Sequence, residues 1–456
     1  MFTSSIYSKS IMSFATTILL FLFVHSASAT PFFFDYKKNR VDFSQWQYEG
    51  VTSLAVDPSI NHYTWTVQVG EGPYDQIRIH RYVQEEHNFL KRPYRRAPDS
   101  RKVLFILNGT WGQEGDEPLE EFDSYFFPTN GYDLWTMDYR TAFVPNIAYD
   151  EFETLGKQEE LLTTADWTYG AFREDIKTAV DFAKRIARTK KVFMAGRSRG
   201  GQQAFIYAAK YERDLKGIIG LDGGPIYRAE QNPDAQQPQA AYEGALAALA
   251  SGATGAELLN EVANYENGRL VGTLPNVTAQ IGEPLPDESE LPFGPVPDGS
   301  AIDSLSDLLA YQTYFLGLPG FDIGLPGLLT NVYTPYPGGE GETYMDKSVL
   351  QVGLSNYSRY WPFVQNLENT FLTGYANNPY LDYDDTQDVT VPVMHFVGNF
   401  TCPFGSCLGL DRPFSTGSDD FSVKFLPGFG HLDVYYGTHA QDEVKEPMLE
   451  WMNNRL

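Results

Sequence analysis

A serine flanked by glycines is the part of this sequence best suited to catalysis. The stretch Gly196-Arg197-Ser198-Arg199-Gly200-Gly201 follows an apolar run, Lys191–Ala195, and precedes a helix-forming run that starts at Gln202. This order predicts a strand, a sharp turn that holds the serine, and a helix. A serine at a helix N-terminus suits nucleophilic attack, because free backbone N–H groups there stabilise an oxyanion. The competing interpretation is an ordinary glycine-rich turn.

Segments with strand and helix patterns alternate on both sides of this serine. We expect strands at His62–Val69, Gln76–Val83, Lys102–Leu107, Tyr132–Met137, Lys191–Ala195, Gly217–Leu221, Val391–Val397 and Phe421–Leu426, and helices at Pro118–Phe127, Phe172–Ala187, Gln202–Tyr211 and Gln441–Met452. The first two strands are expected to form an antiparallel pair. The later alternation predicts an α/β fold with a parallel sheet and right-handed crossovers.

The alternation stops over residues 226–389. Two helices are expected there, Ala240–Ala250 and Ala256–Tyr265, and later stretches such as Pro284–Pro297 and Gly317–Pro326 are rich in proline and glycine. A long insertion at this point is typical of a cap or lid over the sheet, because long connections near a site usually serve function. The predicted organisation is a signal peptide at 1–29, an α/β core at 30–225 and 390–456, and the cap at 226–389.

The whole pattern resembles the α/β-hydrolase superfamily, in which a serine, an acid and a histidine follow in that chain order. The resemblance covers roughly residues 60–225 and 390–456 and is most specific at the glycine-flanked serine. It implies a mostly parallel, eight-stranded sheet flanked by helices, with a large cap or lid insertion. It also implies Ser198 as nucleophile and no cofactor.

The resemblance places the base in the loop after the last strand, where His431 follows Phe421–Gly430. His395 lies inside an apolar strand pattern and is expected to be a buried core residue. His439 is the remaining rival. It lies beyond the loop, near the final helix, where reach to the serine oxygen is less favourable.

The acid is open between several aspartates. Most members of the superfamily take it from the residues after the strand that ends here at Val397, but Gly398–Cys402 contains no carboxylate. Asp411 is the first candidate there. Some members take the acid from the end of the preceding strand, where Asp222 stands, and Asp222 is our first choice. Asp433 is a further alternative, because any well-placed carboxylate can orient the imidazole.

The resemblance implies an oxyanion hole of two backbone N–H groups. One is expected from Arg199, directly after the serine. The other is expected from the loop after Lys102–Leu107, with Thr110 as first choice and Trp111 as second. If that loop faces the site, Asn108 is a poor glycan acceptor despite its N-x-[ST] sequon.

Arg197 and Arg199 flank the serine and suggest a site for an acidic substrate group. We favour the simpler interpretation, a salt bridge to a nearby carboxylate such as Asp138.

The N-terminus has the layout of an export signal. Lys9 precedes the apolar run Ile11–Val24, and Ala27-Ser28-Ala29 supplies small residues for cleavage near Ala29. The apolar run is too short to cross about 30 Å of hydrocarbon as a helix. We therefore expect a secreted or periplasmic protein with no membrane span.

Export permits a disulfide, and we expect one between the two cysteines, Cys402 and Cys407, which enclose a short loop. Two cysteines without clustered histidines make a metal site unexpected. Glycosylation is predicted only if the source glycosylates secreted proteins. The four sequons begin at Asn108, Asn276, Asn356 and Asn399.

The formal net charge of −25, from 59 acidic and 34 basic residues, argues against a nucleic acid partner, because phosphate would be repelled. These features together predict a secreted serine hydrolase that cleaves carboxylic esters, with a small molecule or short polymer ester as substrate. Two alternatives stay open. One is a serine peptidase or amidase acting on short peptides, and the other is a catalytically silent binding protein of the same fold.

Overall fold

The computed structural model describes only part of the 456-residue chain. The described residues are 45–85, 94, 96–110, 112, 123–144, 166–224, 247, 296–300, 305–315, 326–327, 329–339, 341–355, 362, 365, 368, 389–398 and 416–456. Contacts divide the chain into two units, Met1–Gln45 and Trp46–Leu456, and every helix and strand given below belongs to the second.

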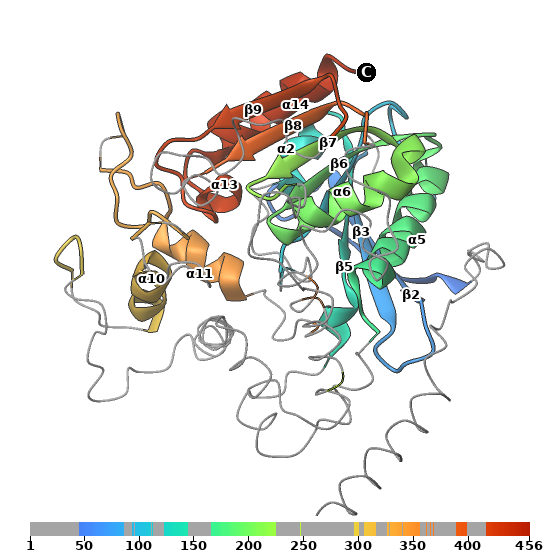
Figure 1. Cartoon of the computed structure of the whole chain (residues 1–456), viewed down its shortest axis with the longest axis horizontal. Helices are drawn as coiled ribbons and strands as arrows, with labels where there is room; N and C mark the ends of the chain where they lie inside the picture. The colour runs from blue at the N-terminus through green and yellow to red at the C-terminus, as the bar shows by residue number, and fades with distance from the viewer. Residues whose placement is uncertain are drawn as a thin grey trace, which may run out of the picture. The chain divides into compact units, whose positions relative to one another are not determined.

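A nine-stranded sheet forms the centre of the second unit (Figure 1). Its strands are β1 (Gln47–Ser53), β2 (Ile60–Gln68), β3 (Gln76–Gln84), β4 (Val103–Leu107), β5 (Asp133–Asp138), β6 (Val192–Arg197), β7 (Leu215–Leu221), β8 (Val393–Val397) and β9 (Phe421–Phe425). Their order is β1-β2-β3-β5-β4-β6-β7-β8-β9. The pairs β1–β2, β2–β3 and β3–β5 are antiparallel, and all later pairs are parallel.

Helices cover both faces of this sheet. The described helices are α2 (Asp123–Thr129), α5 (Tyr169–Ala187), α6 (Arg199–Tyr211), α10 (Leu305–Phe315), α11 (Lys347–Ser355), α13 (Asp433–Tyr436) and α14 (Glu446–Asn453). On one face, Trp451 of α14 contacts Phe193 of β6 with 6.0 Å between ring centroids. On the other, Phe182 of α5 contacts Trp135 of β5 at 6.3 Å. Strands β4 to β8 are almost wholly buried, which explains why apolar residues dominate the sequences of all but β5.

The sheet has one strand more than the eight expected. The additional strand is β1, which pairs antiparallel with β2 at the edge and carries a bulge between Tyr48 and Gly50. Its sequence, QYEGVTS, is largely exposed and lacks a regular alternation of apolar and polar residues. Periodicity therefore offers no signal for β1, and its pairing with β2 decides its conformation.

The expected cap lies mostly outside the described residues. This holds for the helices predicted at 240–250 and 256–265, of which only residue 247 is described. Two helices that the sequence did not predict, α10 and α11, fall within 226–389. The boundaries predicted for the signal, core and cap remain predictions.

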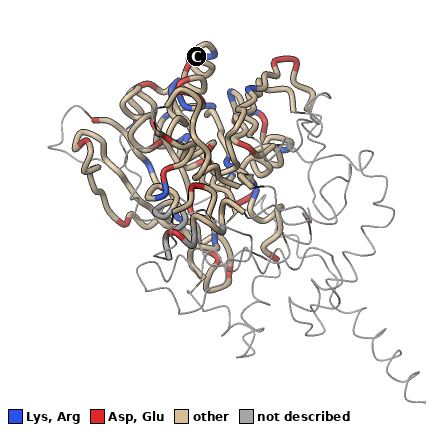
Figure 2. Tube along the Cα trace, turned by 90° about the vertical axis from the view of Figure 1, so that its left-hand side faces the viewer, with Lys and Arg blue, Asp and Glu red and all other residues tan. Residues whose placement is uncertain are grey.

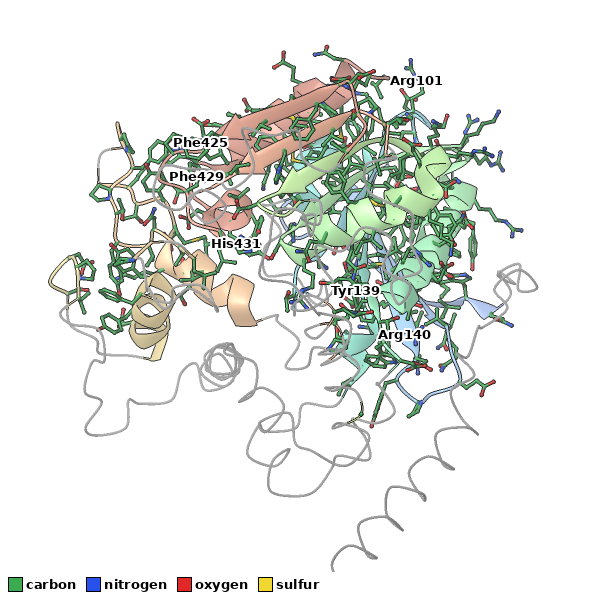
Figure 3. All side chains as sticks on the ribbon, in the orientation of Figure 1. Arg101, Tyr139, Arg140, Phe425, Phe429 and His431 are labelled. Atoms are coloured by element: carbon green, nitrogen blue, oxygen red, sulfur yellow. The ribbon has the colours of Figure 1, made fainter. Side chains whose placement is uncertain are left out.

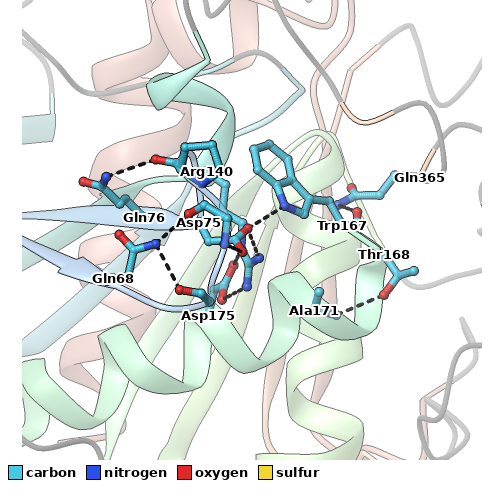
Figure 4. Close-up of polar contacts among 12 residues, drawn as sticks. Gln68, Asp75, Gln76, Arg140, Trp167, Thr168, Ala171, Asp175 and Gln365 are labelled. Atoms are coloured by element: carbon cyan, nitrogen blue, oxygen red, sulfur yellow. Dashed lines mark hydrogen bonds and ion pairs between the residues drawn. The ribbon is translucent and has the colours of Figure 1, made fainter. Parts of the chain in front are cut away.

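A buried ion cluster ties the end of β5 to helix α5 and to the β2–β3 turn (Figure 4). The Arg140 guanidinium donates to both oxygens of Asp175, at 2.6 and 2.8 Å, and to Asp75 at 2.6 Å. The Trp167 indole N–H donates to the same Asp75 oxygen at 2.8 Å. Removing the shared cation would leave two buried carboxylates uncompensated, so the cluster fixes how these three elements meet.

Acidic and basic residues are interspersed along the described chain (Figure 2). Within that part, no helix is long and apolar enough to cross a bilayer. The same residues contain no group of three or more His, Cys, Asp or Glu placed to hold a metal ion.

Candidate active site

Ser198 stands in a strained turn between β6 and α6. Its backbone angles are φ 51° and ψ −122°, which an L-residue adopts only under constraint from its surroundings. The flanking glycines supply that constraint. A Cβ on Gly196 would lie 2.2 Å from the carbonyl oxygen of Gly200, and a Cβ on Gly200 would lie 2.4 Å from that of Leu107. The turn therefore requires glycine at both positions, in agreement with the predicted serine turn.

Asp222 follows β7 directly beside this turn. The Ser198 N–H donates to the carbonyl of Leu221 at 3.0 Å, so serine and aspartate lie at the ends of adjacent strands. Asp222 is 1% exposed and, like the serine, has a positive φ of 43°. Its Oδ1 accepts the N–H of Gly398 at 2.8 Å. Its Oδ2 lies 2.6 Å from Nδ1 of His431.

The structure thus joins two of the predicted site residues, Asp222 and His431, across 209 positions of sequence. His431 is 7% exposed and lies in the loop between β9 and α13, close to Phe429 (Figure 3). Asp411, the alternative acid, lies outside the described residues.

Asp433 contacts the histidine loop in a different way. Its carboxylate accepts from Thr330 Oγ1 at 2.7 Å and from the backbone N–H groups of Asn331 and Gly430 at 2.9 and 2.7 Å. Burial raises the pKa of Asp433 to about 6, although these donors and His431 oppose the rise. Asp433 therefore links segment 330–331 to the loop that carries His431.

The loop after β4 packs on the serine turn. A Cβ on Gly109 would lie 3.1 Å from the Cβ of Ser198. Thr110 and Arg199, whose N–H groups were predicted to bind an oxyanion, are both partly buried, and Trp111 lies outside the described residues.

Asn108 begins this loop and is 2% exposed. Its side-chain amide donates to the backbone carbonyl of Met137 at 3.3 Å, and its backbone carbonyl accepts from the Tyr139 hydroxyl at 3.0 Å. An amide packed in this way leaves no room for a glycan in the folded protein, which agrees with the expectation that Asn108 is a poor glycan acceptor. The other three sequons lie outside the described residues, as do both cysteines and the signal segment.

Arg197 forms the predicted kind of salt bridge, but with a carboxylate other than the one expected. Its guanidinium donates to Asp123, stacks over Tyr436 at 5.7 Å, and reaches Asn108 Oδ1 at 3.4 Å. Burial opposes ionisation of Asp123, yet Lys445 and Arg197 hold its pKa below the usual value.

Asp138, the partner suggested for the flanking arginines, is bonded elsewhere. It lies 3.1 Å from His80 and 3.4 Å from Arg78, on the antiparallel side of the sheet. The sequence could not show which of the two aspartates pairs with Arg197, because Asp123 and Asp138 both lie many residues before β6.

The other histidines have separate environments. His439 stacks on Tyr336 at 3.5 Å and pairs with Glu342 at 3.1 Å. His395 is buried within β8 as predicted, and burial lowers its pKa to about 4.

Two residues near the site were missed by the sequence analysis. The Tyr435 hydroxyl lies against the His431 ring. Tyr435 follows His431 by four residues, a spacing that brings two side chains together on a helical turn and could have predicted this contact. Glu368 is fully buried and accepts from the N–H of Tyr169 at 2.8 Å. Burial raises the pKa of Glu368 to about 8, against a lowering influence of Tyr169 and Arg199. No sequence pattern pointed to Glu368.

Comparison with known proteins supports the fold. No family model matches the chain. A presumed lipase from Sulfolobus solfataricus has a similar structure, with a TM-score of 0.58 and 22% identity over 90% of this chain and 99% of its own. The structure of a carboxylesterase from Nitrososphaera gargenis aligns over 89% of this chain and 100% of its own, at 12% identity and a TM-score of 0.42. With the strand order and the serine turn, the first comparison shows that this chain has the α/β-hydrolase fold.

Proposed function

We propose that this protein is a serine hydrolase that cleaves carboxylic esters through Ser198, His431 and Asp222. The observation that carries the proposal is the 2.6 Å contact of His431 Nδ1 with Asp222 Oδ2, at the sheet edge where Ser198 occupies its strained turn. A carboxylate on Nδ1 keeps the proton there and leaves the lone pair of Nε2 available as a base.

In the proposed reaction, His431 Nε2 takes the proton of Ser198 as the serine oxygen attacks the ester carbonyl. Asp222 stabilises the imidazolium that forms. The N–H groups of Arg199 and Thr110 bind the oxyanion, and the imidazolium then protonates the departing alcohol. Water repeats these steps on the acyl-enzyme and releases the acid, restoring the serine.

The local structure supports the roles of Ser198 and Thr110. Ser198 is the N-cap of α6, so its oxygen is near the helix N-terminus, where anionic charge is stabilised. Gly109 lies against Ser198, which brings the following residue, Thr110, close to the turn. The ester is proposed to be a small molecule or a short polymer, and no cofactor takes part.

The first test is labelling with a fluorophosphonate probe, followed by peptide mapping, together with assays on p-nitrophenyl esters and peptide anilides. Labelling at Ser198 with ester turnover is expected, and both should be lost in Ser198→Ala while its unfolding curve is unchanged. A preference for anilides would indicate a peptidase or amidase. A folded protein without labelling would indicate a silent binding protein.

We also propose that the chain is exported to the periplasm or outside the cell, with cleavage after the signal at 1–29 and a Cys402–Cys407 disulfide. The support is the order of Lys9, the apolar run Ile11–Val24 and the small residues before position 30. Mass spectrometry of the secreted protein, with and without reduction, tests the mature N-terminus and the disulfide together.

A further inference from the structure

The hydroxyl of Tyr435 lies over the face of the His431 imidazole. Its oxygen is 3.2 Å from Nδ1 and 3.1 Å from Nε2. Only Cε1 separates these two nitrogens, so an oxygen along the in-plane lone pair of one would be far from the other. An in-plane oxygen equidistant from both at this range would collide with Cε1. The remaining position is above the ring.

The orientation of the two rings agrees with this placement. Their planes meet at 81° with centroids 5.3 Å apart, so the phenol stands edge-on to the imidazole and directs its hydroxyl at the face. Tyr435 is 6% exposed and belongs to α13, the helical turn that starts two residues after the histidine. The hydroxyl and the ring are therefore held together inside the fold.

We propose that Tyr435 is a positioning residue for the general base, holding the imidazole between Asp222 and Ser198 and stabilising its protonated form. This inference rests on the proposed function, in which His431 is the general base. The contact between Tyr435 and His431 is an observation that does not depend on that function. When the ring is protonated, the hydroxyl can turn its lone pairs toward the cation, and a dipole in a dry site interacts strongly with a charge. The in-plane nitrogens stay available for Asp222 and for Ser198.

Besides Tyr435, two titratable groups of the described residues interact with His431. Asp222 faces Nδ1 from the end of β7, and Asp433 acts on His431 from α13. Asp222 is in turn close enough to His395 of β8 to influence its charge. A pH profile alone could mix these groups, so the test needs a signal from His431 itself.

The variant is Tyr435→Phe, which keeps the ring and removes only the hydroxyl. We expect the midpoint at which the His431 Cε1 proton resonance titrates to move to lower pH by about half a unit or more, since one unit corresponds to about 1.4 kcal/mol. The acidic limb of kcat/KM for p-nitrophenyl acetate should move in the same direction. The value of kcat should fall several-fold, with KM nearly constant.

The matched control is Tyr333→Phe. Tyr333 is 7% exposed, about as buried as Tyr435, and its hydroxyl has no hydrogen-bond partner, so both midpoints should stay as in the wild type. If Tyr435→Phe does not fold, Tyr435→Leu should give the same resonance shift. An unchanged or higher His431 midpoint in the variant would overturn the proposal. Because the resonance needs no turnover, a protein without esterase activity would refute the proposed function and still test Tyr435.

Discussion

Replacing Asp222 by asparagine tests the proposed proton path through its hydrogen bonds. The carboxylate has two acceptors in use, with Oδ1 accepting the Gly398 N–H and Oδ2 facing His431 Nδ1. Asparagine has one acceptor and one NH2 group. The buried Gly398 N–H needs an acceptor, so the oxygen of the asparagine should face Gly398 and its NH2 group should face His431 Nδ1. Nδ1 must then accept, so the ring proton moves to Nε2, the atom that should take the serine proton.

The expected cost in kcat/KM for Asp222→Asn is about 10⁴, the loss known for this change in a serine triad, or about 5 kcal/mol of barrier. The protein should still fold, because asparagine keeps the shape of the side chain and the Gly398 bond. Turnover of a p-nitrophenyl ester at saturating and low substrate separates the effect on kcat from that on KM. Urea unfolding checks the fold.

The matched comparison is Asp411→Asn, the other acid that the sequence left open. We expect it to change kcat/KM by no more than a few-fold. A loss below tenfold in Asp222→Asn would refute the tautomer argument. A large loss confined to Asp411→Asn would assign the acid to the loop after β8, and the contact between Asp222 and His431 would then be structural only.

Three further predictions concern stability. Gly223→Ala should cost at least about 3 kcal/mol of stability or prevent folding, because its Cβ would lie 1.8 Å from the Ser198 carbonyl oxygen. The control Gly50→Ala, whose Cβ would have no atom within 4 Å, should change stability by no more than about 1 kcal/mol. Similar urea midpoints for the two variants would contradict the packing argument. Burial raises the pKa of Glu368 to about 8 from 4.5, so the wild type loses stability as pH rises between these values. Relative to Glu368→Gln it should lose about 2 kcal/mol between about pH 5 and about pH 7, and parallel stability curves would show that no buried carboxyl is titrating. Arg140→Met should cost about 3–5 kcal/mol by chemical denaturation, since it leaves both of its carboxylates buried and unpaired, and a neutral effect would mean that water reaches the cluster.

The order of the core elements was predictable from local patterns. Strands β4 to β8 are buried on both faces, so apolar residues dominate most of their sequences. The exception is β5, which also buries Asp133, Thr136 and Asp138. The serine turn was predictable because its glycines stand between an apolar strand pattern and a helix pattern. The contact of Gly196 with Gly200 is local, whereas the contact of Gly200 with Leu107 arises only in the folded chain. The element ends differ by a few residues, as for β7, which begins at Leu215 and was expected from Gly217.

Other features left no local trace. β1 is polar and irregular, and only its pairing with β2 makes it a strand. Helices α10 and α11 lie within the expected cap, where no helix was predicted at either position. The structure also bonds residues 330–331, inside the expected cap, to the histidine loop through Asp433, an attachment between segments about 100 positions apart.

The sequence by itself determined which residue types could carry the chemistry: a serine in a glycine-bounded turn and a histidine after the last strand. It left the acid open, because several aspartates stand at strand ends and a carboxylate can reach an imidazole from more than one of them. The tertiary structure decided which aspartate contacts the histidine. The register of β7 and β8 brings Asp222 to Gly398 and His431, and a contact across 209 positions depends on how the strands assemble, which no local pattern encodes.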